Sequence, residues 1–377
     1  MRSIGYGALA RRVGIAPCAE PLIPTRLARL AAALGDLPFS RGGGASGIAS
    51  GRVDCSAPKA ALAAAIFGLA SLFASAASAA DNVIVGSVGS TSANQWPLYI
   101  ALKKGFFAAE GFNVDTVFAQ SNASVVQQLA AGSTNVATSA GLVDPIRAIE
   151  KGAPLGIVRI EIQAPPYALL ARRDIKEMKE LKGKTVIVGG AKDITRIFTD
   201  RMLAAHGLKP GDFDYVFAGA TNARFSALQS GGVDAALLTA PFNFYAESAG
   251  FTNLGFTFDY LSDMPFAGVA MSRTWAAANP DAARRFLGVT VKTIGWFYDE
   301  RNRAEAVKIM ADVSKLKPDD VEKAYDFLGG KKLFEPTGKV SKAKIGKVVD
   351  ALRELGDVPA DFAVDRLFLP GVTQVVD

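Results

Sequence analysis

Short apolar runs alternate with amphipathic stretches between residues 83 and 272. The runs are rich in Val, Ile and Leu and predict β-strands at 83–88, 113–119, 135–140, 154–162, 167–172, 185–190, 214–219, 234–239, 253–258 and 266–272. The stretches between them predict helices at 97–104, from 122 onward, and at 144–152, 193–207, 223–232 and 241–250, with a polar helical turn at 174–183. This alternation is typical of a mainly parallel α/β sheet, and the chain after 272 is predicted to be mostly helical to near Gly356.

Two breaks in the alternation predict two lobes. The first is Gln163-Ala164-Pro165-Pro166, and the second is DYLSDMP at 259–265. A chain that leaves one α/β half, builds a second half and returns crosses between them twice, here at 163–172 and 259–266. We therefore expect lobe 1 to comprise 81–171 and 263–377, including a helical C-terminal tail, and lobe 2 to comprise 172–262. Two lobes joined by a two-stranded hinge can close around a ligand.

The first 80 residues have the features of a leader. Lys59 precedes the apolar run ALAAAIFGLASLFA (61–74), and Ala77-Ser78-Ala79 fits the small-x-small cleavage pattern, so residues 59–80 are predicted to be a cleaved signal peptide. The run is shorter than the roughly 20 apolar residues of a membrane span, and the alternatives are a buried helix or an uncleaved anchor. Residues 1–58 are predicted to be a disordered extension or the product of a misassigned start, with translation from Val53 as one hypothesis. Export would place the protein in the periplasm.

The net charge of +6 belongs to this leader. Residues 1–80 contain eight Lys and Arg against three Asp and Glu, which leaves 34 basic and 33 acidic residues in 81–377. Residues 81–377 therefore lack the excess of positive charge that is typical of nucleic-acid-binding proteins, and we expect no nucleic-acid partner.

Reactive side chains are scarce outside the leader. Cys18 and Cys55 both lie within it, and His206 is the single histidine of the chain. The mature chain would therefore have no disulfide, no thiolate nucleophile and no His-rich or Cys-rich metal site. We expect no catalytic residue, no metal and no cofactor, and we expect His206 to stabilise the C-terminal end of its helix.

Four segments resemble one protein family in matching order. They are WPLYIALKKGFFAAEGFNV (96–114), ELKGKTVIVGG (180–190), LAAHGLKPGDFDYVF (203–217) and ALQSGGVDAALLTAP (227–241). They are similar to landmarks of the substrate-binding proteins of ABC importers for nitrate, sulfonates, taurine and thiamine-pyrimidine precursors. The resemblance implies a type II periplasmic-binding-protein fold, α/β in class, with a ligand between its lobes. It also implies a monomer that meets an inner-membrane ABC permease and its ATPase.

Candidate ligand contacts lie in loops after the predicted strands, because ligands of parallel sheets bind at strand carboxyl ends and beside helix N-termini. The loop at 90–96 is dense in hydrogen-bonding side chains, and two glycines in 189–195 allow close backbone approach. The residues expected to contact the ligand are Ser90, Thr91, Asn94, Gln95, Trp96, Ser121, Asn122, Ser139, Ala140, Gly190, Thr195, Asn222, Arg224, Thr239, Pro241 and Phe242.

Several of these residues have a structural alternative. Trp96 could stack on a planar ligand or pack under the helix that it begins. Asn122 could contact the ligand or cap a helix. Arg224 could meet a carboxylate, sulfonate or phosphate at a helix N-terminus, or it could form a surface salt bridge. Asp193 is assigned only a helix-capping role. Lysines at 331–347 are expected to form solvated faces, with transporter docking as the alternative.

The function expected from these features is capture of a small organic or anionic molecule for delivery to an ABC importer. One alternative is an enzyme on the same fold, such as a pyrimidine-precursor synthase or a desulfinase. Another is a ligand-sensing module for a membrane receptor. Sulfonates, taurine, nitrate, pyrimidines and aromatic acids all remain open, while the 23 Phe residues favour an organic ligand.

Overall fold

The computed structural model describes residues 80–89 and 91–377, which belong to one compact unit, Ala76–Asp377. The predicted extension, the predicted signal peptide up to residue 79, and Ser90 lie outside the described residues. Along the described part of the chain, no helix is both long enough and apolar enough to cross a membrane.

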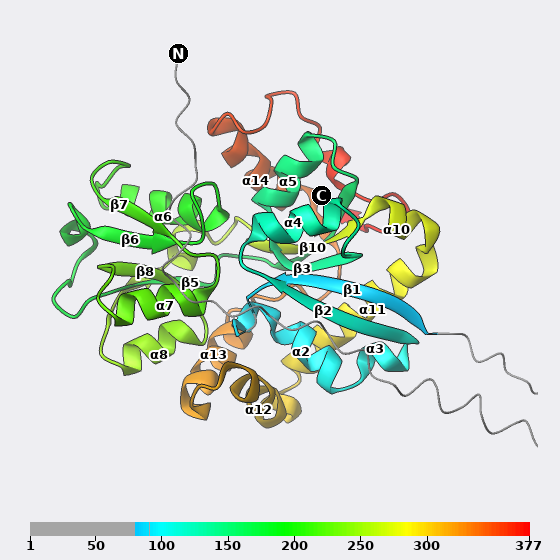
Figure 1. The fold of residues 1–377 in the computed structure, drawn as a ribbon, viewed down its shortest axis with the longest axis horizontal. Coiled ribbons are helices and arrows are strands. Elements are labelled where there is room, and N and C mark those ends of the chain that lie inside the picture. Colours follow the sequence, from blue (N-terminus) through cyan, green and yellow to red (C-terminus); the bar gives the residue numbers. More distant parts are fainter. Residues whose placement is uncertain (1–79, 90) are drawn as a thin grey trace, which may run out of the picture. The chain divides into compact units, whose positions relative to one another are not determined.

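The first sheet has five strands in the order β2-β1-β3-β10-β4 (Figure 1). Their bounds are β1 (Asp81–Val88), β2 (Phe112–Ala119), β3 (Val136–Gly141), β4 (Leu155–Ile162) and β10 (Ala267–Ser272). β1 pairs in parallel with β2 and β3, whereas β10 is antiparallel to β3 and β4. β3, β4 and β10 are buried along their whole lengths. Burial on both faces explains why their sequences are mostly apolar and small residues, with Arg159 and Glu161 of β4 as buried exceptions.

Helices cover both faces of this sheet. They are α2 (Trp96–Lys103), α3 (Phe106–Ala109), α4 (Asn122–Ala130), α5 (Val143–Glu150), α10 (Arg273–Ala278) and α11 (Pro280–Tyr298), preceded by a short 3-10 turn, η2 (Ala93–Gln95). Successive strand residues point to opposite faces, so Val83 and Val85 pack in one core with Phe107 of α3 and Phe286 of α11. Figure 1 shows α4 and α5 on the opposite side of the sheet.

The second sheet has the order β7-β6-β8-β5-β9. Its strands are β5 (Tyr167–Ala171), β6 (Thr185–Val188), β7 (Asp214–Phe217), β8 (Ala235–Thr239) and β9 (Thr252–Phe256), and its helices are η3 (Met178–Leu181), α6 (Ile194–Ala204), α7 (Thr221–Gln229), α8 (Phe242–Ser248) and α9 (Phe258–Leu261). Leu169 and Phe198 of α6 belong to the core on one face. Leu170, Phe225 of α7 and Phe242 of α8 form the core on the other.

The chain crosses between the lobes at 163–166 and again between α9 and β10. β5 pairs with β8 and β9, so it belongs to the second sheet. The predicted boundary between residues 171 and 172 is corrected accordingly, because a strand belongs to the lobe in whose sheet it pairs. β5 and β10 are antiparallel to both of their neighbours, since each carries the chain across from the opposite lobe.

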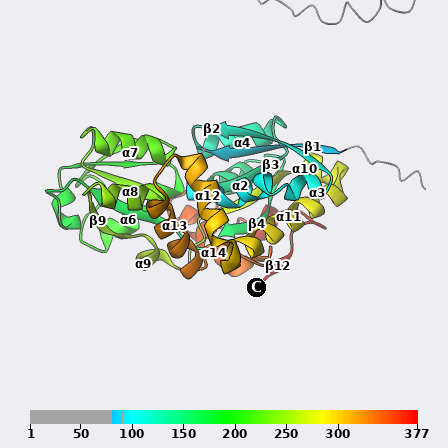
Figure 2. The same cartoon turned by 90° about the horizontal axis from the view of Figure 1, so that it is seen from below.

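The C-terminal region contacts both lobes. It comprises η4 (Glu300–Asn302), α12 (Arg303–Ser314), α13 (Pro318–Gly330), β11 (Val340–Ser341), α14 (Lys342–Glu354), η5 (Val364–Leu367) and β12 (Val375–Val376). α12 packs against α2 of lobe 1, and α13 packs against α8 of lobe 2 (Figure 2). The Phe327 ring of α13 stacks on Phe256 of β9 with 5.1 Å between ring centroids. The C-terminal tail was predicted to belong to lobe 1, but its helix α13 packs against α8 of lobe 2.

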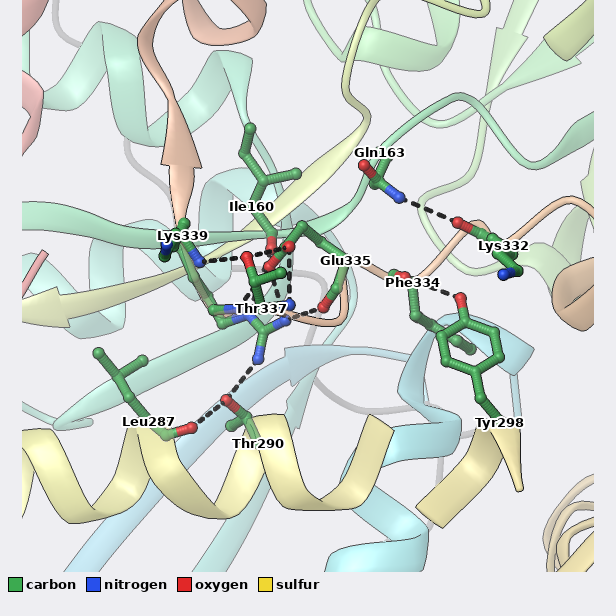
Figure 3. A network of polar contacts seen from close by, with 12 residues as sticks. Ile160, Gln163, Leu287, Thr290, Tyr298, Lys332, Phe334, Glu335, Thr337 and Lys339 are labelled. Carbon is green, nitrogen blue, oxygen red and sulfur yellow. Dashed lines mark hydrogen bonds and ion pairs between the residues drawn. The ribbon is translucent and has the colours of Figure 1, made fainter. Parts of the chain in front are cut away.

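A buried cation, Arg159, holds the segment between α13 and β11 against the first sheet. Figure 3 shows its neighbours Thr290 on α11 and Glu335 in that segment. Arg159 of β4 is fully buried, donates to Thr290 Oγ1 of α11 at 2.7 Å, and donates to the backbone carbonyl of Glu335. The Glu335 carboxylate lies 3.4 Å from the same guanidinium. Burial lowers the pKa of Arg159, and the charges of Glu161 and Glu335 oppose that shift. Arg159 therefore links the edge strand β4, the helix α11 and the tail.

Replacing Arg159 should destabilise the protein strongly. Arg159→Met would leave the buried carboxylates of Glu161 and Glu335 without their cation, and losing one partner of a buried ion pair costs roughly 3–5 kcal/mol. Urea unfolding followed by circular dichroism measures this loss. Arg301→Met removes an arginine that is 89% exposed in its pair with Asp299, and it should leave the midpoint unchanged. Equal midpoints for the two variants would contradict this role of Arg159.

Candidate functional site

A polar cavity of about 30 Å³ lies between the two lobes. The loops after β1, β2, β6, β7 and β8 contribute to it, which is the expected position for a ligand of parallel sheets. Hydroxyl and amide side chains predominate. The described residues that line it are Val88, Gly89, Thr91, Ser92, Asn94, Gln95, Asn122, Ser139, Tyr167, Asp193, Thr195, Gly219, Ala220, Thr221, Asn222, Arg224, Thr239 and Phe266.

The lobe 1 wall is built on the short turn η2. Ser92 accepts a hydrogen bond from Asn94 N at 3.1 Å and so caps this turn. Thr239 Oγ1 of the other lobe lies 3.3 Å from Asn94 Oδ1, and Ala93 N donates to Ala240 O at 2.8 Å. The turn that carries Asn94 and Gln95 is therefore hydrogen-bonded to the end of β8 across the cleft.

Ser139 is held in an unusual conformation at the end of β3. Its φ is 51°, in the left-handed region that residues with a Cβ rarely adopt. Glu161 of β4 compensates by accepting from Ser139 N at 2.6 Å and from Ser139 Oγ at 3.0 Å. Burial raises the pKa of Glu161, while Arg159 and the two Ser139 hydrogen bonds act in the opposite direction. Glu161 thus positions Ser139 from behind the cavity wall.

The lobe 2 wall includes the N-terminus of α6. Asp193 caps this helix, with its carboxylate accepting from Thr195 N at 2.9 Å and from Thr195 Oγ1 at 2.5 Å. The other carboxylate oxygen accepts from Asn122 Nδ2 of lobe 1 at 2.9 Å. Asn122 Oδ1 accepts in turn from Gly141 N at 3.1 Å. One capping aspartate therefore also joins the lobes beside the cavity.

Arg224 is buried and faces no carboxylate within ion-pair distance among the described residues. Its Nε donates to Leu237 O at 2.7 Å, and Nη1 donates to the carbonyls of Ala218 and Gly219. The guanidinium also lies 5.8 Å from the Tyr167 ring centroid. Burial lowers the pKa of Arg224, and the neighbouring Tyr167 and Asp193 act in the opposite direction. The surface salt bridge considered for this residue is therefore excluded.

Ion pairs outside the cavity also cross the cleft. Lys192 Nζ lies 3.2 Å from Asp357, and Arg147 pairs with Asp357 while donating to the Lys192 carbonyl. Arg201 of α6 pairs with Glu354 of α14 at 3.0 Å. These pairs border a groove of about 460 Å³ next to α6 and α14.

Nine of the predicted contact residues line the cavity, namely Thr91, Asn94, Gln95, Asn122, Ser139, Thr195, Asn222, Arg224 and Thr239. Trp96 does not line it. Its ring is fully buried against Phe297 and Tyr325, and Nε1 donates to Ala306 O at 2.8 Å. The scaffold alternative is therefore the observed environment of Trp96.

Five other predicted residues that the structure describes do not line the cavity. Ser121, rather than Asn122, is the N-cap of α4. Ala140 is buried within β3, and Phe242 packs on Phe225 in the lobe 2 core. Gly190 and Pro241 precede α6 and α8, where their carbonyls accept from the backbone N–H groups of Asp193 and Tyr245.

Sequence reasoning missed Tyr167 and Glu161, and it gave Asp193 only its capping role. Tyr167 and Glu161 lie inside apolar strand runs, where side chains that face a cleft cannot be told from core side chains. His206 lies away from the cavity, with Nε2 2.7 Å from Tyr260 Oη at an exposed position. Within residues 80–89 and 91–377, no group of three His, Cys, Asp or Glu side chains could hold a metal ion.

Gly219 should control how closely the lobes approach. A Cβ at this position would lie 1.9 Å from the Gln120 carbonyl oxygen of lobe 1. Gly219→Ala should therefore hold the lobes apart and increase the radius of gyration measured by small-angle X-ray scattering. Gly232→Ala is the matched control, because its nearest contact would be an ordinary 3.5 Å. A Gly219→Ala variant as compact as Gly232→Ala would refute this steric role.

Asp144 should make stability depend on pH. Burial and the charge of Asp193 raise its pKa from 3.8 to about 7, against the effect of Arg147. The folded protein then binds a proton that the unfolded chain has released, so stability is lost as the pH rises through this window. Asp144→Asn should gain on the order of 4 kcal/mol relative to the parent between about pH 4 and about pH 8.

Urea unfolding at several pH values measures the Asp144 effect. Asp361→Asn is the control for loss of a carboxylate at an exposed position. If the Asp144→Asn difference were constant with pH, the assigned environment of Asp144 would be wrong.

Comparison with known proteins identifies relatives of this chain. YtlA of Bacillus subtilis (strain 168) is 21% identical over 281 residues, which cover 72% of this chain and 83% of YtlA. The structure of the alkanesulfonate-binding protein SsuA from Xanthomonas axonopodis pv. citri is similar with a TM-score of 0.62 and 21% identity, covering 78% of this chain and 98% of SsuA. The periplasmic nitrate-binding protein NrtA from Synechocystis PCC 6803 gives 0.64 and 18%, covering 78% and 86%.

An enzyme also shares the fold. The desulfurization enzyme DszB has a TM-score of 0.57 at 14% identity, covering 78% of this chain and 97% of the enzyme. At these identities the structural likeness establishes the two-lobed fold of periplasmic binding proteins and no particular ligand. The family profile described as NMT1/THI5 like matches residues 92–304, which is more than half of the chain. The protein with the residues and fold described above therefore belongs to the NMT1/THI5-like family.

Proposed function

We propose that this protein is an exported solute-binding protein of an ABC importer. It acts in the periplasm as a monomer, captures a small organic or anionic molecule between its lobes, and delivers it to an inner-membrane permease with its ATPase. It has no nucleic-acid partner. Family membership and the ligand-binding functions named for SsuA and NrtA support this proposal.

The observation that carries the proposal is a polar cavity with walls from both lobes. Asn94 and Ser139 belong to one lobe, whereas Asp193, Arg224 and Thr239 belong to the other. A ligand in this space contacts both walls only when the lobes are closed. Binding therefore stabilises the closed form by the contacts that the open form lacks, which is the signal that a permease needs to distinguish loaded from empty protein.

Two other functions remain as alternatives. An enzyme is possible on this fold, as DszB demonstrates. The described cavity lining, however, contains no Cys, His or Lys. Its carboxylate, Asp193, is already engaged in capping α6 and in the bond from Asn122. The second alternative is a sensing module, which would bind its ligand in the same way and differ only in its membrane partner.

A ligand panel tests the proposal. The panel contains sulfonates, nitrate, pyrimidines, aromatic acids and small amino acids, and the readouts are the thermal midpoint and the scattering radius. At a concentration of about 100 times Kd, a ligand should add roughly 2.7 kcal/mol of stability. Mass spectrometry of the purified protein identifies any ligand carried through purification. A protein that responds to no member and carries no ligand would rule the proposal out, and turnover of a bound compound would favour the enzyme.

A further inference from the structure

Gln95 presents an unused hydrogen-bond acceptor at the cavity. The residue is 2% exposed, and its Nε2 donates to Val88 O at 2.9 Å, which fixes the orientation of the amide. The other amide atom, Oε1, is buried and has no hydrogen-bond partner. A buried carbonyl without a partner costs free energy, and a donor on an entering molecule would recover it. The residue itself lines the cavity.

The opposite wall of the cavity offers backbone N–H donors and a positive charge. The N-terminus of α7 lies at the cavity through Ala220, Thr221 and Asn222, and no side chain caps it. Its first N–H groups are therefore available to an anion, and the helix dipole favours negative charge there. Arg224, in the first turn of this helix, adds a full positive charge although its Nε and Nη1 groups are bonded to backbone carbonyls. The N-termini of α4 and α6 are capped by Ser121 and Asp193.

The formal charges of the described cavity lining balance. Arg224 supplies one positive charge and Asp193 one negative charge, and the other described lining residues are uncharged at neutral pH. A bare oxyanion would add a negative charge to this balanced lining and would leave Gln95 Oε1 without a donor. A simple amine would leave the α7 N-terminus and Arg224 unmatched. A small molecule that carries both charges can place its amine against Gln95 and its oxyanion against the α7 N-terminus.

Resting on the proposed function, we infer that the ligand is a small zwitterion: its protonated amine donates to Gln95 Oε1, and its oxyanion binds the N-terminus of α7. This assigns Gln95 as the residue that selects amine-bearing ligands over simple acids. The small size of the cavity favours a compact molecule in which a few bonds separate the two charged groups.

Isothermal titration calorimetry on matched compounds tests the inference. 2-Aminoethanesulfonate is compared with ethanesulfonate, 3-aminopropanoate with propanoate, and ethylamine serves as the compound without an oxyanion. A hydrogen bond between an ammonium group and an amide carbonyl should make each amino acid bind about tenfold or more tightly than its amine-free counterpart. Ethylamine should bind more weakly than either amino acid. Equal affinities within the pairs would overturn the inference.

Two variants locate the preference at Gln95. Gln95→Met removes the acceptor and should abolish the preference for the amine-bearing member of each pair. Gln128→Met is the matched control, since Gln128 Oε1 is also buried and unpartnered but does not line the cavity. A preference that survives Gln95→Met contradicts the assignment, and the measurements on the parent protein do not depend on how the variant folds.

Failure of the inference can be told apart from failure of the proposed function. A co-purified or panel ligand without a protonatable amine would overturn the zwitterion while leaving solute binding intact. A protein that binds neither these compounds nor any other panel member, and carries no co-purified ligand, would contradict the proposed function itself.

Discussion

Asn122 of lobe 1 donates a hydrogen bond to Asp193 of lobe 2, and the closed arrangement depends on this and similar bonds across the cleft. Polar groups that are buried between two lobes need partners, because an unsatisfied buried group costs roughly 1–3 kcal/mol. Asn94 meets Thr239, and Ala93 N meets Ala240 O, so most of this cost is avoided by bonds between the lobes. Among the described side chains that line the cavity, Gln95 Oε1 is buried without a hydrogen-bond partner. This free acceptor is the basis for inferring that the ligand carries a hydrogen-bond donor.

The rest of the molecule holds the two walls in position. Arg159 ties β4 to α11 and to the tail, and the neighbouring Glu161 uses its buried carboxylate to hold Ser139 in the left-handed conformation. Trp96, whose sequence position is next to the contact residues, is instead packed on Phe297 and Tyr325 under the same wall. The side chains that determine closure therefore include several that a ligand would never touch.

The sequence predicted the fold well because each strand and helix has a local signal. The strand runs and helix starts match the observed elements within a few residues. The lobe boundary was misplaced because pairing of β5 with β8 is a long-range property with no local signature. Nine lining residues were found from their positions after strand ends. Tyr167 was missed because an apolar strand run does not reveal which side chain faces the cleft, and Glu161 was missed because it acts through Ser139 from behind the cavity wall.

The most direct measurement for this account is a crystal structure of the protein with its co-purified or panel-identified ligand. The account predicts that the ligand occupies the cavity and makes hydrogen bonds to residues of both lobes, including the wall that contains Gln95 and the N-terminus of α7. A ligand that contacts only one lobe, or one that lies in the groove next to α6 and α14 while the cavity stays closed, would contradict it.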